Sequence, residues 1–432
     1  MTMERARLEC EPPTDKYKLI FFILVLHGIG TLTPWNMFIT AKDYFVSYKL
    51  SANYTGQNNT EYAANYLAYV GFASQIPNVL FNWMNIFVNL GGNLTTRVVW
   101  SLIIEIIVFL VTVILAMVDS SAWPETFFWV TMGSVVILNM AGGIFQNTAY
   151  GMAAKLPSKY TGAVVLGSNI SGTFATVISI LSGSIWSSVR KAAIYFFITA
   201  IFVILLCFDT YFAMPLNKFY RYHELMSEKQ QEKAARSGIN VKARPPYFLI
   251  FRQSFMQLFN VFFTFFVTLT VFPAVHSDIK QTGEGDFMGM VPRELFTAIT
   301  CFLTFNVFAM LGSLTTSWVK WPTPKYLIWP IVLRVVFVPL FLFCNYHPLA
   351  VERVLPVYIS NDYIYWGIAV VMSYSSGYLS SLAMMYAPQS QSNPQYQITA
   401  GMMAAAMLIT GIFSGILFSF VFPSFVKIAV SI

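Results

Sequence analysis

The sequence predicts an all-α, polytopic membrane protein with 11 transmembrane helices, and three observations support this prediction. Of its 432 residues, 56% are apolar and 10% are charged, whereas a soluble domain carries about 25% charged residues. Apolar runs of about 20 residues, long enough to cross a bilayer, recur almost from end to end. Runs such as 102–117 are apolar on all faces, unlike the alternating strands of a β-barrel. A water-soluble fold is therefore excluded.

Charges, prolines and polar clusters bound the apolar runs and set the expected helices. Six helices are expected at 17–40, 65–90, 97–118, 124–150, 160–187 and 192–214, and five more at 254–275, 293–318, 326–345, 361–387 and 397–426. The first run is too long for a cleavable signal peptide. The expected organisation is a cytosolic N-terminus 1–18, a first bundle 19–214 with an outside loop 41–64, a cytosolic linker 215–253 and a second bundle 254–432.

The distribution of cations predicts the orientation. With the N-terminus in the cytosol, 17 Lys and Arg residues lie in inside segments and 8 in outside segments. Because cytosolic loops carry the excess of Lys and Arg, this favours a cytosolic N-terminus and an outside C-terminus. The first outside loop also carries two glycosylation sequons, at Asn53 and Asn58. The plasma membrane is the expected location, with endolysosomal membranes as the alternative.

The net charge is +7. We assign the excess cations to the cytosolic side of the membrane and expect no nucleic-acid partner. The linker 215–253 combines eight cations with glutamates at helical spacing. It predicts either a surface helix near anionic headgroups or a solvated linker with no partner. The four cysteines form no disulfide framework. The sequence contains no phosphate-binding loop, HExxH motif or catalytic triad, so neither an enzyme nor a metal or cofactor is expected.

A row of amide side chains marks the second expected helix. The row comprises Gln75, Asn78, Asn82, Asn85 and Asn89, which share one helix face. Amides can pair with the edge of a nucleobase, although hydrogen bonding between membrane helices is a common alternative. Because Gln75 and Asn78 lie nearest the middle of the bilayer, they are the stronger ligand candidates.

Two other helices carry polar residues on one face. The fourth helix has Asn139, Gly142, Gly143, Gln146 and Tyr150 at steps of three or four residues. A glycine beside a glutamine lets either a ligand or another helix approach closely. On the first helix, His27, Thr31 and Trp35 share a face. Trp35 could stack on a base or anchor at the bilayer interface, and His27 is either a packing residue or a titratable group.

Glu105, Asp209 and Arg334 are the ionisable residues deepest in the expected helices. Charged residues at membrane depth are functional candidates by default. Scattered charges can equally form structural pairs, and the sequence does not show which pairs form.

The run 30–40 (GTLTPWNMFIT) resembles the GTLLPWNFF signature in the first helix of the equilibrative nucleoside transporters. Further similarities follow in family order: 219–222 (FYRY), 272–275 (FPAV), 301–306 (CFLTFN), 334–339 (RVVFVP), 376–379 (SGYL) and 399–401 (TAG). They extend from the first to the last expected helix.

The resemblance implies a fold similar to the major facilitator architecture and passive, alternating-access transport of nucleosides. By position in the motifs, Trp35 would lie at the substrate cavity and Gln146 would hydrogen-bond the ligand. Gly142 would be the inhibitor-sensitive glycine, and Arg334 matches a family arginine. One difference concerns Ala309 and Ser313, which stand where relatives usually carry an Asp and an Arg that contact the nucleoside.

This difference leaves the substrate open. Either Asn306 and the amide row supply the missing contacts, or the substrate has changed, for example to a nucleobase. Two alternatives to nucleoside transport also remain. One is a proton-linked or organic-cation carrier in which His27, Glu105 or Asp209 titrates, and the other is a transport-inactive membrane protein that only binds its ligand. The expected partners are a small-molecule nucleoside and the lipid bilayer, and the sequence does not indicate an oligomeric state.

Overall fold

The computed structural model describes residues 13–42, 44–56, 62, 66–88, 94–236, 245–348 and 353–428. These residues form helices joined by loops, with isolated β-bridges between loop residues. Nine of the described helices are long and apolar enough to cross a membrane. With α5 and the shorter apolar segment around α13 and α14, they are consistent with the eleven expected spans.

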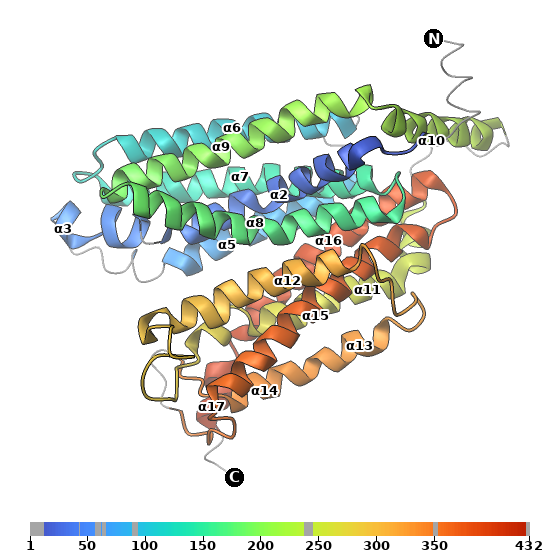
Figure 1. Cartoon of the computed structure of the whole chain (residues 1–432). Coiled ribbons are helices and arrows are strands. Elements are labelled where there is room, and N and C mark those ends of the chain that lie inside the picture. The colour runs from blue at the N-terminus through green and yellow to red at the C-terminus, as the bar shows by residue number, and fades with distance from the viewer. Residues whose placement is uncertain are drawn as a thin grey trace.

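The first helix set contains α2, α5, α6, α7, α8 and α9 and forms the upper half of Figure 1. Their bounds are Leu19–Thr40, Tyr66–Phe87, Leu94–Met117, Pro124–Ala153, Ser158–Ile185 and Val189–Ala213. At the start of α2, the Asp15 carboxylate accepts hydrogen bonds from the backbone N–H groups of Ile20 and Phe21, both at 3.1 Å. This satisfies donors that have no partner within the helix and fixes where the first span begins.

The second helix set contains α11 to α17 and forms the lower half of Figure 1. The longer helices are α11 (Tyr247–Val271), α12 (Thr304–Thr315), α15 (Asp362–Gln389) and α16 (Pro394–Ser419). The shorter ones are α13 (Ile328–Leu333), α14 (Phe337–Phe343) and α17 (Phe422–Ile428). The linker between the two sets includes α10 (Lys218–Arg236), which lies at one end of the molecule (Figure 1).

Two expected helices of the second set have irregular winding. A π-helical turn, η6 (Ala298–Leu303), precedes α12, and the Thr304 hydroxyl donates to the Ile299 carbonyl five residues earlier, at 2.8 Å. A 3-10 turn, η7 (Arg334–Val336), separates α13 from α14. Proline cannot donate a backbone hydrogen bond, and Pro330 and Pro339 lie on either side of this turn.

The two sets pack together through α8 against α12 and α15, and through α16 against α5 and α7. Near the α10 end, small residues let methionines of the second set approach. A Cβ at Gly151 would lie 2.9 Å from Met402 Cγ, and one at Gly162 would lie 2.9 Å from Met385 Sδ. The Asn147 amide also donates to the Met402 carbonyl at 2.7 Å. We call these contacts the α10-end seam.

Candidate functional site

The polar face of α7 lies between α5 and α6. A Cβ at Gly142 would be 3.5 Å from Glu105 Oε1 of α6, and one at Gly143 would be 3.0 Å from the Asn78 carbonyl oxygen of α5. The paired glycines therefore allow both neighbouring helices to approach α7 closely. They place Asn78, Gly142 and Glu105 around one segment of α7, inside the first helix set.

The amide row on α5 divides into two parts. Toward the α10 end, Asn85 donates to Asn147 Oδ1 at 2.9 Å and to Thr148 Oγ1 at 3.1 Å, and it accepts a hydrogen bond from Arg97. Asn82 donates to Asn78 Oδ1 at 2.7 Å. Asn85 therefore holds α5 against α7, which is one of the two uses expected for the row, whereas the Asn82 amide bonds within α5. Asn89 lies outside the described residues.

The two glutamines of the candidate site differ from these asparagines. Gln146 on α7 is 1% exposed and Gln75 on α5 is 4% exposed. Both amide atoms of Gln146, and Oε1 of Gln75, have no hydrogen-bond partner among the described residues. An unpaired buried polar group costs about 1–3 kcal/mol, so these atoms are costly to retain for structure alone.

Trp35 lies on α2, partly buried against the core of the first helix set. One residue later, the Asn36 amide donates to Ser171 Oγ of α8 at 3.1 Å. Thr31 and Ser168 hydroxyls also meet between α2 and α8, at 3.1 Å. The α2 face that carries the PWN motif therefore lies along a polar contact with α8. Asn36 and Ser171 were not among the predicted site residues.

The second helix set contributes Asn306 on α12. This side chain is partly exposed and donates to the Phe302 carbonyl of its own helix at 3.1 Å. A side chain at Gly172 of α8 would collide with the Asn306 amide. Asn306 therefore lies where the two helix sets meet, across from α8.

Ala309 and Ser313, the two positions that depart from the family pattern, are both buried. The Ser313 hydroxyl accepts from Asn169 of α8 at 2.6 Å and from Ser381 at 3.0 Å, and it donates to the Gly377 carbonyl at 3.1 Å. A serine hydroxyl has one donor and two acceptor positions, so Ser313 is fully satisfied. It joins the two helix sets rather than presenting a free group to a solute.

The four ionisable candidates have different surroundings. Glu105 is 0% exposed, and neither carboxyl oxygen has a hydrogen-bond partner among the described residues. The His27 ring is 3.2 Å from Thr210 Oγ1 and lies between Phe145 and Tyr211. Asp209 is exposed on α9.

Arg334 is buried and bound on several sides. Its guanidinium donates to Thr268 Oγ1 at 2.6 Å, to Ser375 Oγ at 2.7 Å and to the Met372 carbonyl at 3.3 Å. These bonds connect η7 with α11 and α15, so the surroundings of Arg334 are those of a residue that holds helices together.

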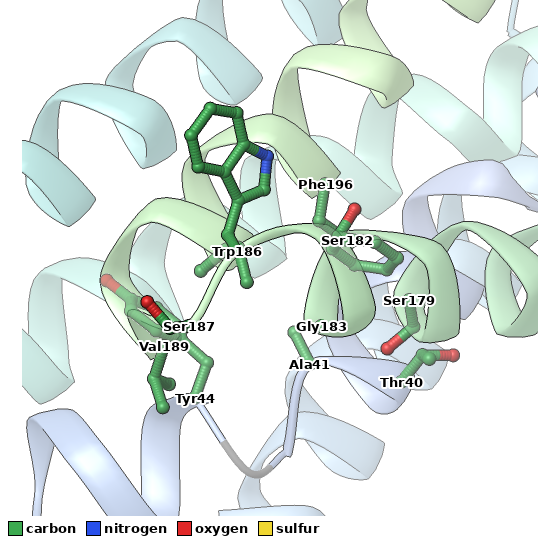
Figure 2. A pocket seen from close by; sticks show the side chains of 12 residues that line it. Thr40, Ala41, Tyr44, Ser179, Ser182, Gly183, Trp186, Ser187, Val189 and Phe196 are labelled. Carbon is green, nitrogen blue, oxygen red and sulfur yellow. The ribbon is translucent and has the colours of Figure 1, made fainter.

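A separate cavity of about 250 Å³ lies at the end of the first helix set opposite α10. Figure 2 shows its lining from the ends of α2 and α8 and the start of α9, including Thr40, Ser182, Trp186 and Phe196. None of the predicted binding residues lines this cavity. Nearby, Asn53 is exposed in α3 (Ala52–Thr55), whereas Asn58 lies outside the described residues.

Comparison with known proteins identifies the family. The nucleoside transporter family model matches residues 132–424, more than half of the chain. Human equilibrative nucleoside transporter 1 is 31% identical, over 96% of this chain and 99% of that protein. Rat equilibrative nucleoside transporter 3 is 30% identical over 87% and 83%, and human equilibrative nucleoside transporter 2 is 29% identical over 96% and 99%.

Solved structures with a similar fold belong to the major facilitator superfamily. The proton:xylose symporter XylE has a TM-score of 0.59 at 11% identity, over 96% of this chain and 90% of that one. A double-tryptophan mutant of XylE has a TM-score of 0.58 at 14% identity, over 94% and 88%. The predicted major-facilitator-like fold is confirmed, and both fold and family are those of membrane transporters, not enzymes. This chain belongs to the nucleoside transporter family.

Proposed function

We propose that this protein carries nucleosides passively across the membrane by alternating access, with the solute held by amide groups of the first helix set. The observation that carries this assignment of the site is the buried amide of Gln146, which has no hydrogen-bond partner among the described residues. A carboxamide offers a donor and an acceptor side by side, the pattern found along the edge of a nucleobase.

The other candidate residues have supporting roles in this proposal. Gln75 and Asn78 provide further hydrogen bonds from α5, next to the α7 glycines, and Gly142 leaves room beside Glu105. Trp35 supplies an aromatic face from α2, and Asn306 reaches the solute from the second helix set. Since Ser313 is fully satisfied by Asn169, Ser381 and Gly377, the hydroxyl groups of the solute are recognised by residues other than those at 309 and 313.

The position of Gln146 connects solute binding to movement. Its neighbour Asn147 donates across the α10-end seam to the Met402 carbonyl. Alternating access requires this seam to open, so a solute that binds Gln146 lies next to the contact that must break. Because of this proximity, a bound solute can make different contacts in the closed and the open state and so shift the equilibrium between them.

The expected topology places α10 and the N-terminus in the cytosol and Asn53 outside the cell or in an organelle lumen. Support comes from Lys159 and Lys320 at the α10 end, where Lys320 Nζ donates to Ser158 Oγ at 3.3 Å, and from the exposure of Asn53 at the opposite end. The plasma membrane is the proposed location, with endolysosomal membranes as the alternative. An enzymatic deglycosylation shift that is lost in Asn53→Gln and Asn58→Gln together would support this orientation.

Uptake by vesicles that contain the purified protein tests the transport function. We expect labelled adenosine or uridine to equilibrate faster than in empty vesicles, without a proton or sodium gradient, and unlabelled nucleosides or nucleobases to compete. If neither nucleosides nor nucleobases exchange above the empty-vesicle rate at pH 5.5 or 7.4, the proposal fails. Ligand binding without flux in the same preparation would indicate the transport-inactive alternative.

One observation favours a second candidate, a proton-linked carrier of the same fold. Glu105 is fully buried without a hydrogen-bond partner, and its carboxyl faces Gly142 beside the proposed site. Buried acidic residues in membrane helices are typical of proton relays. Proton linkage predicts faster uptake with an acidic exterior and loss of that pH dependence in Glu105→Gln. Equal rates at both pH values in the wild-type protein would exclude it.

A further inference from the structure

A pocket of about 200 Å³ lies at the α10-end seam, between the two helix sets. Its first side comes from the turn between α7 and α8 and the first turn of α8, including Ser158 and Thr161. Its second side comes from the end of α15 and the start of α16, including Gln389 and Gln397. Met385, one of the seam residues, also lines it. A molecule in this pocket therefore contacts both helix sets where the seam closes.

The start of α8 presents backbone donors at this pocket. The helix has 28 residues and begins at Ser158, and the preceding Pro157 has no side chain that can cap it. The first N–H groups of a helix have no partner within that helix. Those of Ser158 and Lys159 have no other partner among the described residues. Such N–H groups, together with the positive end of the helix dipole, favour a phosphate.

Thr161 points to a ligand independently of the helix end. Its side chain is 2% exposed and lines the pocket, and its hydroxyl makes no hydrogen bond to another described residue. Other buried threonines of α7 bond back to the carbonyl four residues earlier, Thr131 at 2.8 Å and Thr148 at 2.7 Å. A buried hydroxyl without a partner costs about 1–3 kcal/mol, and a phosphate oxygen in the pocket would accept its hydrogen bond.

The rim of the pocket carries a positive charge. Lys320 Nζ donates to Ser158 Oγ at 3.3 Å, and Lys320 has no carboxylate partner among the described residues. The Tyr386 hydroxyl of α15 donates to the Lys320 carbonyl at 3.3 Å, so this cation approaches from the second helix set. The described lining contains no Asp or Glu. The Asp15 carboxylate bonds to the Tyr160 hydroxyl at 3.0 Å, and Tyr160 lies about 200° around the helix from Ser158.

We propose that this pocket binds a phosphate group. The start of α8 and the hydroxyls of Ser158 and Thr161 hold it from the first helix set, and Lys320 and the Gln389 amide hold it from the second. All these groups can donate a hydrogen bond, and Gln389 makes none to another described residue. Because the donors come from both sets, the phosphate binds fully only when the seam is closed, and it stabilises the closed arrangement.

Melting of the purified full chain in detergent tests the site. Sodium phosphate at about 10 mM is compared with sodium chloride at the same pH and ionic strength, and we expect phosphate to raise the melting temperature by about 2 °C or more beyond chloride. Equal melting in the two salts would overturn the proposal. Since a lipid headgroup could supply the same group, dioleoyl phosphatidic acid is tested as well. Stabilisation by this lipid and not by inorganic phosphate would assign the site to a headgroup.

Three variants separate the pocket from general effects of the salt. Thr161→Val removes the hydroxyl, and it should melt like the wild type in chloride because no bond is lost. Lys320→Gln removes the cation. We expect both to lose the shift that phosphate causes. Lys325→Gln removes another exposed cation of the same loop and is the matched control that should keep it. A shift that survives in Thr161→Val, or that disappears in Lys325→Gln, would place the effect outside the pocket and overturn the proposal.

Nucleoside exchange tests the effect on the seam, which rests on the proposed function. Vesicles with phosphate or chloride on both sides are compared for exchange of labelled adenosine. We expect phosphate to slow exchange by the wild type by about twofold or more and to leave Thr161→Val unaffected. Equal exchange in both salts, despite a melting shift, would show that the phosphate does not hold the seam closed. If the wild type does not exchange adenosine even in chloride, the proposed function fails, whereas the melting comparison still decides the phosphate site.

Discussion

Two buried ionisable residues, one in each helix set, have opposite surroundings. Arg334 in the second set donates hydrogen bonds to Thr268, Ser375 and the Met372 carbonyl. Glu105 in the first set has no hydrogen-bond partner for either oxygen among the described residues. A buried polar group whose bonds are satisfied supports a fixed structure, whereas one without bonds is costly to retain for structure alone. The difference indicates that Arg334 supports the packing of the second set, whereas Glu105 does not hold its helix to a neighbour by a hydrogen bond.

Two uncharged residues, Ser313 and Gln146, differ in the same way. Ser313 in the second set is fully satisfied by Asn169, Ser381 and Gly377. Gln146 in the first set has two free amide atoms among the described residues. We therefore place recognition of the solute mainly on the first set, and treat the second set as the partner against which it moves.

Replacing Arg334 by Leu should have the largest effect on stability. The change leaves the buried acceptors on Thr268, Ser375 and Met372 without their donor, and we expect a loss of about 3 kcal/mol. The measurement is the melting temperature and the yield of monodisperse protein. The melting temperature of Arg334→Lys, which keeps the charge, should lie between those of the wild type and Arg334→Leu. A melting temperature of Arg334→Leu equal to that of the wild type would contradict the structural role.

Replacing Ser313 by Ala should have an intermediate effect. It leaves the Asn169 amide and the Ser381 hydroxyl without their shared acceptor, at a cost of about 1–3 kcal/mol. Ser317→Ala, on an exposed residue just beyond α12, is the matched control and should melt like the wild type. If both variants melt alike, Ser313 does not join the two sets as proposed.

Glu105→Gln should have little effect on stability or should raise it slightly. The variant replaces an unpartnered carboxyl by an uncharged group of the same size, so no bond is lost. We expect a change of at most about 1 kcal/mol in the favourable direction, measured as the melting temperature at pH 7. A marked loss of stability would show that Glu105 has a structural role like that of Arg334, and the contrast between the two sets would fail.

The smallest effect concerns a loop of the first set outside the membrane. The Ser121 backbone N–H and the Tyr54 hydroxyl donate to Asp119 and lower the pKa of that carboxyl from its ordinary 3.8 to about 2. A lowered pKa contributes stability that is present above the ordinary value and is lost as the pH falls through the folded value.

Thermal melting between pH 5 and pH 2 measures this contribution. The wild type should lose slightly more stability than Asp119→Asn as the pH falls from about 4 to about 2. Parallel curves for the two proteins would remove Asp119 as a contributor.

Much of the fold could be predicted from the sequence because apolar runs bounded by charges determine where helices cross the membrane. The residue spacing also predicted a close approach at the glycine pair on α7, but it left open whether Asn85 would bind a ligand or join helices. The partners of Arg334 and the bond from Asn169 to Ser313 could not be predicted, because they join residues that are far apart in the chain and depend on how the helices pack. The winding of η6 likewise depends on local hydroxyl contacts that a hydropathy pattern does not contain.

The most direct test measures adenosine uptake and melting on the same preparations of Gln146→Leu and Asn85→Leu. We predict that Gln146→Leu lowers saturable uptake by about tenfold and leaves the melting temperature unchanged or higher, because its amide has no partner to lose. Asn85→Leu should lower the melting temperature, because it breaks the bonds to Arg97, Asn147 and Thr148. Wild-type uptake by Gln146→Leu, together with reduced stability, would contradict the account.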